Sequence, residues 1–357
     1  MQPRVIHTAQ ALIDEVVEVP ALPERGGNVM AGAHYLYAGG AVNILVAAAR
    51  SGARCVHAGA IGTGPNGDLV RAALTREGIT WSAPAVTEID TGVCFVMIEP
   101  SAERTFVTTQ SAERRISVAS LQTSAPETGD VVCISGFSLV GRTRDPLLAW
   151  LDTLPAGVVV VLDPGATFGE LEPAVQDRVL AQTTVWTSNA DEARALVGVG
   201  EIADSVVAVA GRLPSGGVAI VRDGPVGCVV HVDGATTMLP GYPQRPVDTN
   251  GAGDTHAGVL VAGRTAGLDW VTAARRANAA GAIKVTRRGP ATAPTAREID
   301  EFLAVQDSGV GSVPGSSWGS GGRGVSGGAG GSSQPRGRSG FTGHSGHGAD
   351  RSYRLVT

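Results

Sequence analysis

One short stretch, Asp248-Thr249-Asn250-Gly251-Ala252-Gly253-Asp254, indicates more about this chain than any other. It stands directly before an apolar run, residues 257–262, that predicts a helix. Small residues let a backbone approach a ligand closely, and amides at a helix N-terminus have partial positive charge. We therefore expect this stretch to bind anionic oxygens. A carboxylate at its edge, Asp254, would repel a phosphate, but it is explained if it accepts a proton from a hydroxyl group that attacks the phosphate.

The composition is that of a globular protein. The chain has 357 residues, of which 43% are hydrophobic, and a formal net charge of −5. This is sufficient for a large core, and nothing in the charge indicates binding to nucleic acid or to a membrane surface. The cysteines Cys55, Cys94, Cys133 and Cys228 lack metal-ligand spacing, and we expect buried thiols in a reducing cytoplasm. We find no signal peptide and no apolar run long enough to span a membrane.

Basic side chains are almost all arginine, and Lys284 is the only lysine. A Walker A loop requires a lysine after its glycines, and a protein kinase requires one after a Gly-rich loop. Neither order occurs in this sequence. Phosphate must therefore be bound by backbone amides, arginine and a metal ion.

The chain divides into two parts. We interpret residues 1–307 as one α/β unit and residues 308–357, rich in Gly, Ser and Arg, as a disordered tail. From residue 131 onward apolar runs alternate with helical patterns, which is typical of βαβ units and a parallel sheet. The segment 91–109 predicts a hairpin, and with residues 11–19 we expect it to form a small separate sheet that serves as a lid.

The individual elements follow from the same patterns. Strands are predicted at 11–19, 93–99, 104–109, 131–135, 158–163, 184–187, 217–222 and 228–232. Helices are predicted at 41–50, 69–77, 145–154, 191–197, 255–265 and 270–285.

A second glycine motif, Gly62-Thr63-Gly64-Pro65-Asn66-Gly67, matches the GxGxxG loop of dinucleotide-binding proteins. It follows a strand-like run, and Glu88 or Asp90 lies roughly where an acid would bind ribose. However, Pro65 interrupts the loop and the strand is not the first of its unit. An NAD-dependent oxidoreductase is therefore the weaker alternative.

Three further groups stand where strands and helices meet. Gly39-Gly40 with Asn43 is either a turn at a helix start or a place where a substrate approaches and Asn43 binds its hydroxyls. Asp14 is either a turn residue or a carboxylate that accepts sugar hydroxyls. Asn189-Ala190-Asp191-Glu192 is either a capping box or a site that positions a metal-bound water beside nucleotide phosphates. His256 would point away from Asp254 on the same helix, which favours packing over catalysis.

Taken together, these motifs resemble the PfkB/ribokinase family of carbohydrate and nucleoside kinases over residues 4–303. The resemblance includes Gly39-Gly40 with Asn43, Gly59-Ala60-Ile61-Gly62 with Gly67, and the stretch 248–254, in the family's order. It implies a ribokinase-like three-layer sandwich with a mostly parallel central sheet and a small β-sheet lid. It also implies ATP-dependent phosphorylation of a hydroxymethyl group on a small sugar or sugar derivative, with Mg²⁺. A nucleoside kinase of the same family is the alternative.

The resemblance implies a role for each matching residue. Asp254 would be the catalytic base, and the anion hole would comprise the amides of Gly251, Ala252 and Gly253. The sugar would be bound by Asp14, Gly39, Gly40 and Asn43. The nucleotide would be bound by Asn189, Gly224, Gly227 and Asn278. Glu192 would bind Mg²⁺ through water, and Asp248 lies where many members bind a monovalent cation such as K⁺. Family members are often dimers through the lid, so a homodimer is also implied.

The chain departs from the family's pattern in places that surround the acceptor. Two residues separate Gly40 from Asn43 where many members have three. His256 stands where relatives are often aromatic, and Thr8 and Ala9 stand where a glycine is common. The shape of the acceptor site is therefore less well predicted than the base.

Overall fold

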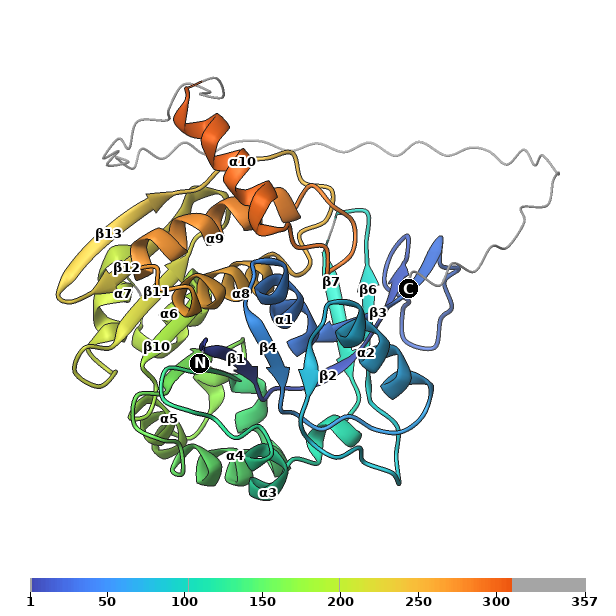
Figure 1. The fold of residues 1–357 in the computed structure, drawn as a ribbon. Coiled ribbons are helices and arrows are strands. Elements are labelled where there is room, and N and C mark those ends of the chain that lie inside the picture. The colour runs from blue at the N-terminus through green and yellow to red at the C-terminus, as the bar shows by residue number, and fades with distance from the viewer. Residues whose placement is uncertain (1, 102, 199, 310–357) are drawn as a thin grey trace, which may run out of the picture.

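The computed structural model describes residues 2–101, 103–198 and 200–309. The predicted tail lies outside the described residues from position 310 onward. Two β-sheets organise the described chain, with helices on both faces of the larger one (Figure 1). The large sheet has the spatial order β13 (Ala235–Pro240), β12 (Gly227–Val232), β11 (Val218–Arg222), β10 (Val185–Asn189), β9 (Val159–Asp163), β8 (Val131–Ser135), β1 (Arg4–His7), β4 (Arg54–His57) and β5 (Thr80–Trp81).

The central strands are buried on both faces. In β8, Val131 and Cys133 pack into one hydrophobic cluster and Val132 and Ile134 into another. Side chains alternate across a strand, so each face of the sheet needs its own layer of helices. The first cluster includes helices α1 (Ala41–Arg50), α2 (Pro65–Arg76), α8 (Ala252–Thr265), α9 (Trp270–Lys284) and α10 (Ala296–Asp307). The second includes α3 (Val118–Gln122), α4 (Arg144–Leu151), α5 (Pro173–Leu180), α6 (Ala190–Val197) and α7 (Ile202–Ala210). The three-layer α/β architecture is therefore confirmed.

The prediction of a parallel sheet after residue 131 is correct only as far as β11. Strands β5, β4, β1, β8, β9, β10 and β11 are parallel to their neighbours, but β12 and β13 are antiparallel. The connection between β11 and β12 is the single 3₁₀ turn Gly224–Val226. A parallel crossover needs about a dozen residues, so this short connection forces a hairpin.

The lid is a separate sheet with the order β3 (Ala33–Gly40), β2 (Ala11–Glu18), β6 (Val93–Ile98) and β7 (Arg104–Thr108). The predicted hairpin is confirmed, because β6 pairs antiparallel with β7, and β2 joins them through β6. The lid strands stand together at one end of the large sheet (Figure 1). The register places Asp14 and Val16 of β2 on the same face as Tyr37 and Tyr35 of β3.

Candidate active site

The N-terminus of α8 is held in a conformation that only glycine adopts easily. Gly251 has φ +76°, and a Cβ there would lie 2.5 Å from the carbonyl oxygen of Pro290. Among the described residues, the amides of Gly251 and Gly253 have no hydrogen-bond acceptor, whereas the amide of Ala252 donates to the carbonyl of Thr249 at 3.3 Å. In this conformation two of the three predicted anion-hole amides are therefore free to bind an anion.

Asp254 lies in the first turn of α8 and is bound by Asn43 of α1. Nδ2 of Asn43 donates to Oδ2 of Asp254 at 2.9 Å. Burial raises the pKa of Asp254 to about 6, the hydrogen bond from Asn43 and the charges of Arg222 and Lys284 oppose this rise, and Asp163 adds to it. Oδ1 of Asn43 is buried and has no partner among the described residues. Two residues 211 positions apart in sequence thus meet at the proposed base.

Asp14 faces the same region from the lid. Burial raises the pKa of its carboxyl group to about 7, and the nearby charge of Asp254 adds to the rise. A Cβ on Gly39 would lie 2.2 Å from Oδ2 of Asp14, and a Cβ on Gly40, at φ +62°, would lie 2.4 Å from the carbonyl oxygen of Gln10. Both glycines are therefore required by this chain's own packing. Gly39 is the one beside the Asp14 carboxylate.

One arginine and one aspartate in the site were given no role from the sequence. Arg222 ends β11, and its Nη1 donates to Oγ1 of Thr187 at 2.7 Å. Its Nη2 lies 3.8 Å from Oδ2 of Asp163, at the end of β9, and 3.7 Å from where a Cβ on Gly253 would lie. The side chain of Arg222 is only 14% exposed. Arg222 therefore brings a buried positive charge to the anion hole. The available signal was its place at the carboxyl end of a predicted parallel strand, where ligands bind in open α/β sheets.

The Asn189-to-Glu192 group forms a capping box at the start of α6. Oδ1 of Asn189 accepts from the amide of Glu192 at 2.8 Å, and Oε2 of Glu192 accepts from the amide of Asn189 at 2.9 Å. Burial raises the pKa of Glu192, and the charge of Asp163 adds to the rise. The structural interpretation is thus confirmed. It leaves Oε1 of Glu192 without a protein partner among the described residues.

The predicted nucleotide-binding glycines flank the turn between β11 and β12. Gly224 has φ +53° and open space around its Cα, whereas a Cβ on Gly227 would lie 2.1 Å from the carbonyl of Leu239. A cavity of about 470 Å³ adjoins Gly227.

Asn278, which is predicted to bind the nucleotide, is 8% exposed. Its Nδ2 donates to the carbonyls of Leu239 and Pro240 at 3.4 and 3.1 Å, and its Oδ1 lies 3.2 Å from Nε2 of His256. Both ends of its amide thus bond to groups of the protein, and they connect α9 to the end of β13 and to His256. His256 is buried beside it, and burial lowers the pKa of His256 to about 3, so packing is its role.

Asp248 organises the loop before the anion hole. Its Oδ1 accepts from the amide of Asn250 and its Oδ2 from the amide of Gly289, both at 2.8 Å. Its carbonyl accepts from Nζ of Lys284 at 2.9 Å. The atoms that would bind a monovalent cation are thus already engaged with groups of the chain.

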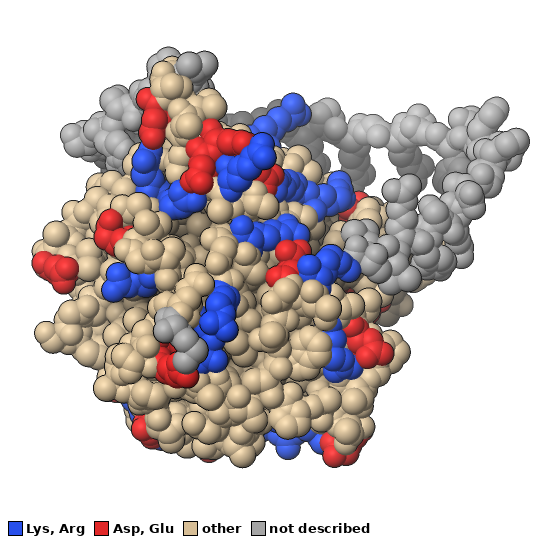
Figure 2. Space-filling view, in the orientation of Figure 1, with Lys and Arg blue, Asp and Glu red and all other residues tan. Residues whose placement is uncertain are grey.

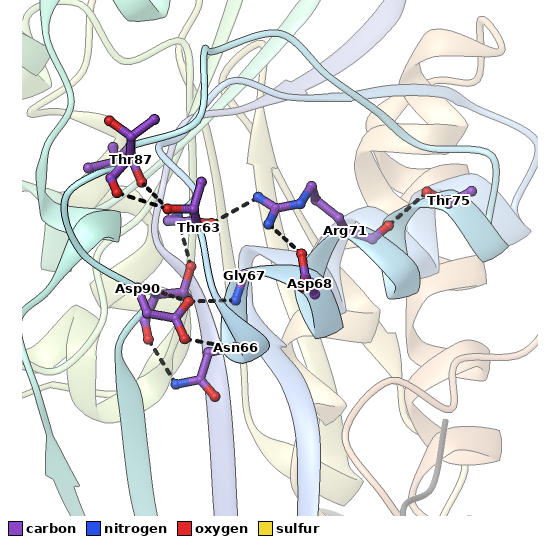
Figure 3. A network of polar contacts seen from close by, with 11 residues as sticks. Thr63, Asn66, Gly67, Asp68, Arg71, Thr75, Thr87 and Asp90 are labelled. Carbon is purple, nitrogen blue, oxygen red and sulfur yellow. Dashed lines mark hydrogen bonds and ion pairs between the residues drawn. The ribbon is translucent and has the colours of Figure 1, made fainter.

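The second glycine motif binds a carboxylate of the protein itself, as Figure 3 shows. Asp90 accepts from the amides of Asn66 and Gly67 at 3.0 and 2.9 Å, at the N-terminus of α2. Asn66 also donates to the carbonyl of Thr91. A dinucleotide would need these amides for its pyrophosphate. The NAD hypothesis is therefore wrong, and the motif instead fixes the segment that leads into β6.

A cavity of about 640 Å³ lies between the lid and two loops near the anion hole. Its lid wall includes Val16, Tyr35, Tyr37 and Ile98, and the two tyrosine rings are stacked with centroids 6.0 Å apart. The loops contribute residues 246–250, Arg288 and Pro290. Two of the residues that line the cavity adjoin the proposed site: Tyr37 is the register partner of Asp14, and Asn250 precedes Gly251.

Several charged side chains on the surface form ion pairs. On the face in Figure 2, basic and acidic side chains are interspersed, and many arginines are paired with carboxylates. In the part of the chain that the structure describes, no helix has the length and hydropathy of a membrane span.

Comparison with known proteins shows the family to which the chain belongs. The model for pfkB family carbohydrate kinases matches residues 7–297. An uncharacterized sugar kinase of Escherichia coli strain K12 is 30% identical over 305 residues, which cover 83% of this chain and 92% of the relative. Ribokinase of Haemophilus influenzae is 30% identical over 302 residues, covering 81% and 95%. The structure of Arabidopsis thaliana ribokinase with ribose and ATP has a TM-score of 0.71 at 21% identity, covering 85% of this chain and 99% of the other.

The fold and the site thus define a ribokinase-like kinase. The chain belongs to the pfkB family of carbohydrate kinases.

Proposed function

We propose that this protein transfers the γ-phosphoryl group of ATP to a hydroxymethyl group of a small sugar or sugar derivative. The observation on which this rests most is the pairing of Asp254 with Asn43 directly beside free amides at the N-terminus of α8. A proton acceptor and an anion site must lie side by side for in-line phosphoryl transfer, because the attacking oxygen bonds to phosphorus as it loses its proton.

In the proposed reaction the carboxylate of Asp254 accepts the proton of the acceptor hydroxyl. The hydroxyl oxygen forms a bond to the γ-phosphorus as the bond to the bridging oxygen breaks, and ADP leaves. The amides of Gly251 and Gly253, joined by that of Ala252 once its weak bond to Thr249 yields, stabilise the charge on the transferring group. Arg222 adds a positive charge beside Gly253, as the absence of a phosphate-binding lysine requires.

The acceptor is bound between the lid and α1 in this proposal. Asp14 accepts sugar hydroxyls, Gly39 leaves room for its carboxylate, and Gly40 allows the chain to turn into α1. Nδ2 of Asn43 donates a hydrogen bond to Asp254, and its Oδ1, which has no partner among the described residues, accepts a hydrogen bond from a hydroxyl of the sugar.

The residues present are compatible with Mg²⁺ bound mainly through ATP. Apart from Asp254, Asp14 and Asp248, which have other roles here, Asp163 and Glu192 bring carboxylates close to Arg222. Among the described residues no group of three His, Cys, Asp or Glu side chains is arranged to hold a metal. Mg²⁺ is often bound by one or two carboxylates together with substrate phosphates, and when bound it neutralises phosphate charge. Glu192 and Asp163 would hold it, directly or through water. Asn189, Gly224 and Gly227 would border the nucleotide.

A nucleoside kinase is the second candidate, and the cavity beside Tyr35 and Tyr37 favours it. Stacked aromatic rings suit a planar base, and a volume of about 640 Å³ exceeds what a single small sugar fills.

The lid also has exposed apolar side chains, among them Phe95 and Val107, and these support the proposal of a homodimer through the lid.

Both candidates are tested by measuring ADP formation with a panel of pentoses, hexoses, sugar acids and nucleosides. We expect one class of acceptor to raise the rate well above the ATP hydrolysis seen without acceptor. A nucleoside with a far higher kcat/KM than its free sugar would establish the second candidate. If no acceptor in the panel is phosphorylated, the proposed function fails.

A further inference from the structure

The only lysine of the chain lies fully buried behind the anion hole. Lys284 is the last residue of α9 and is 0% exposed. A buried ammonium group is costly unless other groups of the protein compensate for its lost hydration. The contacts of its ammonium group show how this cost is offset.

The ammonium group of Lys284 bonds to backbone carbonyls. Nζ donates to the carbonyl of Asp248 at 2.9 Å and to that of Arg287 at 3.3 Å. The charges of Asp248 and Asp254 favour its protonated form, although burial lowers its pKa. Backbone carbonyls close to carboxylates form the kind of environment that binds K⁺. In this chain a side-chain cation occupies it.

The same contacts connect Lys284 to the anion hole. The amides of Val247 and Asp248 donate to the carbonyl of Val285, and the carboxylate of Asp248 accepts from Asn250 and Gly289. Asn250 precedes Gly251, so the ammonium group holds the loop from which the anion-hole amides begin. A monovalent cation at this loop would need the Asp248 carbonyl that Lys284 already binds, so K⁺ does not fit these residues.

We propose that the ammonium group of Lys284 takes the place of a monovalent cation beside the anion hole, so that this enzyme needs no K⁺. The inference rests on the proposed kinase function only where activity is concerned. Its consequence for stability holds whatever the acceptor is.

The test compares K⁺, Na⁺ and tetramethylammonium at equal ionic strength, with the thermal midpoint and kcat/KM as readouts. For the native chain we expect the same midpoint in all three salts, because a specifically bound cation would raise it by mass action. We also expect kcat/KM to vary by less than about twofold, or ~0.4 kcal/mol in the barrier. Selective activation or stabilisation by K⁺ would overturn the proposal, whatever any variant does.

The variant Lys284→Met removes the ammonium group and leaves the carbonyls unpaired. We expect a lower thermal midpoint and a kcat/KM reduced about tenfold or more. K⁺ and NH₄⁺, but not tetramethylammonium, should restore both. If the variant folds but neither K⁺ nor NH₄⁺ raises its thermal midpoint or its kcat/KM, the proposal is contradicted.

A matched control is Arg114→Met. Arg114 is also buried, and its guanidinium group donates to the carbonyls of Phe137, at 2.7 Å, and Val140. Its loss should lower the thermal midpoint without any selective response to K⁺. If no acceptor is phosphorylated at all, the proposed function fails, and the thermal midpoints in the three salts still decide the role of Lys284.

Discussion

At the scale of single residues, the site places two carboxyl groups where burial disfavours their ionised forms and so reduces the stability of the fold. Asp14 and Asp254 are both partly buried, burial raises the pKa of each, and the charge of Asp254 raises that of Asp14 further. Active sites commonly reduce stability in this way because catalysis requires groups with shifted pKa values. The single hydrogen bond from Asn43 favours the ionised form of Asp254 and so keeps it competent as a base near neutral pH.

This cost predicts that Asp14→Asn stabilises the protein at alkaline pH. Burial raises the pKa of Asp14 in the folded protein to about 7, whereas its pKa in the unfolded chain is about 4. The unfolded chain therefore loses this proton more readily, and the carboxyl group destabilises the fold increasingly between about pH 4 and pH 7. Asn cannot ionise. We expect the variant to gain about 1–3 kcal/mol in the free energy of unfolding at pH 8, and little near pH 4, while losing acceptor binding. Urea denaturation at both pH values measures the gain, with exposed Asp191→Asn as control. Equal stability of variant and native chain at pH 8 would contradict the argument.

The residues predicted from the sequence are those whose type and spacing are themselves informative. Asp254 and the glycines before it follow from a contiguous stretch, and Asn43 from its place after two glycines. Arg222 and Asp163 could not be assigned a role, because they meet only when β9 and β11 are set on either side of β10. Asn278 is assigned to the nucleotide only through the family resemblance, and its hydrogen bonds with His256 and with the end of β13 could not be predicted from the sequence.

At the scale of elements, the site depends on how closely α8 packs against α1. A Cβ on Gly258 of α8 would lie 2.3 Å from the carbonyl of Ile44 in α1. This close approach sets the distance between Asn43 and Asp254, since each lies on one of the two helices. Some elements of the structure, among them β1, β3 and α10, were not predicted from the sequence. The strand β1 has four residues, and β3 contains two glycines, whereas the capping box Thr295 to Glu298 at the start of α10 was a usable signal.

We therefore expect Gly258→Ala to separate the two helices and weaken the Asn43–Asp254 hydrogen bond. The variant should lose about 1–3 kcal/mol of stability from overpacking and should lower kcat. Gly281→Ala in α9 is the matched control, because its Cβ would meet no atom closer than 3.9 Å. Replacing a helix-interior glycine in open space should instead stabilise by about 0.5–1 kcal/mol. Chemical denaturation and kcat measurements on both variants test this. Similar losses in the two would show that helix packing does not govern the site.

At the scale of the whole molecule, the site is assembled at the carboxyl ends of the central strands. Asp163 ends β9, Asn189 ends β10 and Arg222 ends β11, which is the edge where open α/β sheets bind ligands. The mostly parallel sheet and the separate lid were predictable because their periodicities differ. The final two antiparallel strands were not, because their apolar pattern resembles that of the parallel strands and only the short turn between β11 and β12 distinguishes them.

Within the described residues, the last contribution to the core comes from α10, which packs against α9, buries Ile299 and Leu303 and ends at Asp307. We therefore expect a chain that ends at Gly309 to have a thermal midpoint within about 2 °C of that of the full chain, which corresponds to a change in stability of about 1 kcal/mol or less. Its kcat/KM should also be unchanged. Calorimetry and the ADP assay on the truncated and full chains measure both. A large loss of either would show that residues 310–357 belong to the kinase unit.

The most direct test of the central claim is Asp254→Asn, assayed for turnover and for ATP binding. Asn keeps the size of the side chain and the contact with Asn43 but cannot accept the proton, so we predict a kcat reduced at least about 10²–10⁴-fold. ATP affinity by calorimetry should change little, and an Asp300→Asn variant on exposed α10 should behave like the native chain. A kcat within a few-fold of the native value, with ATP still bound, would contradict the assignment of Asp254 as the base.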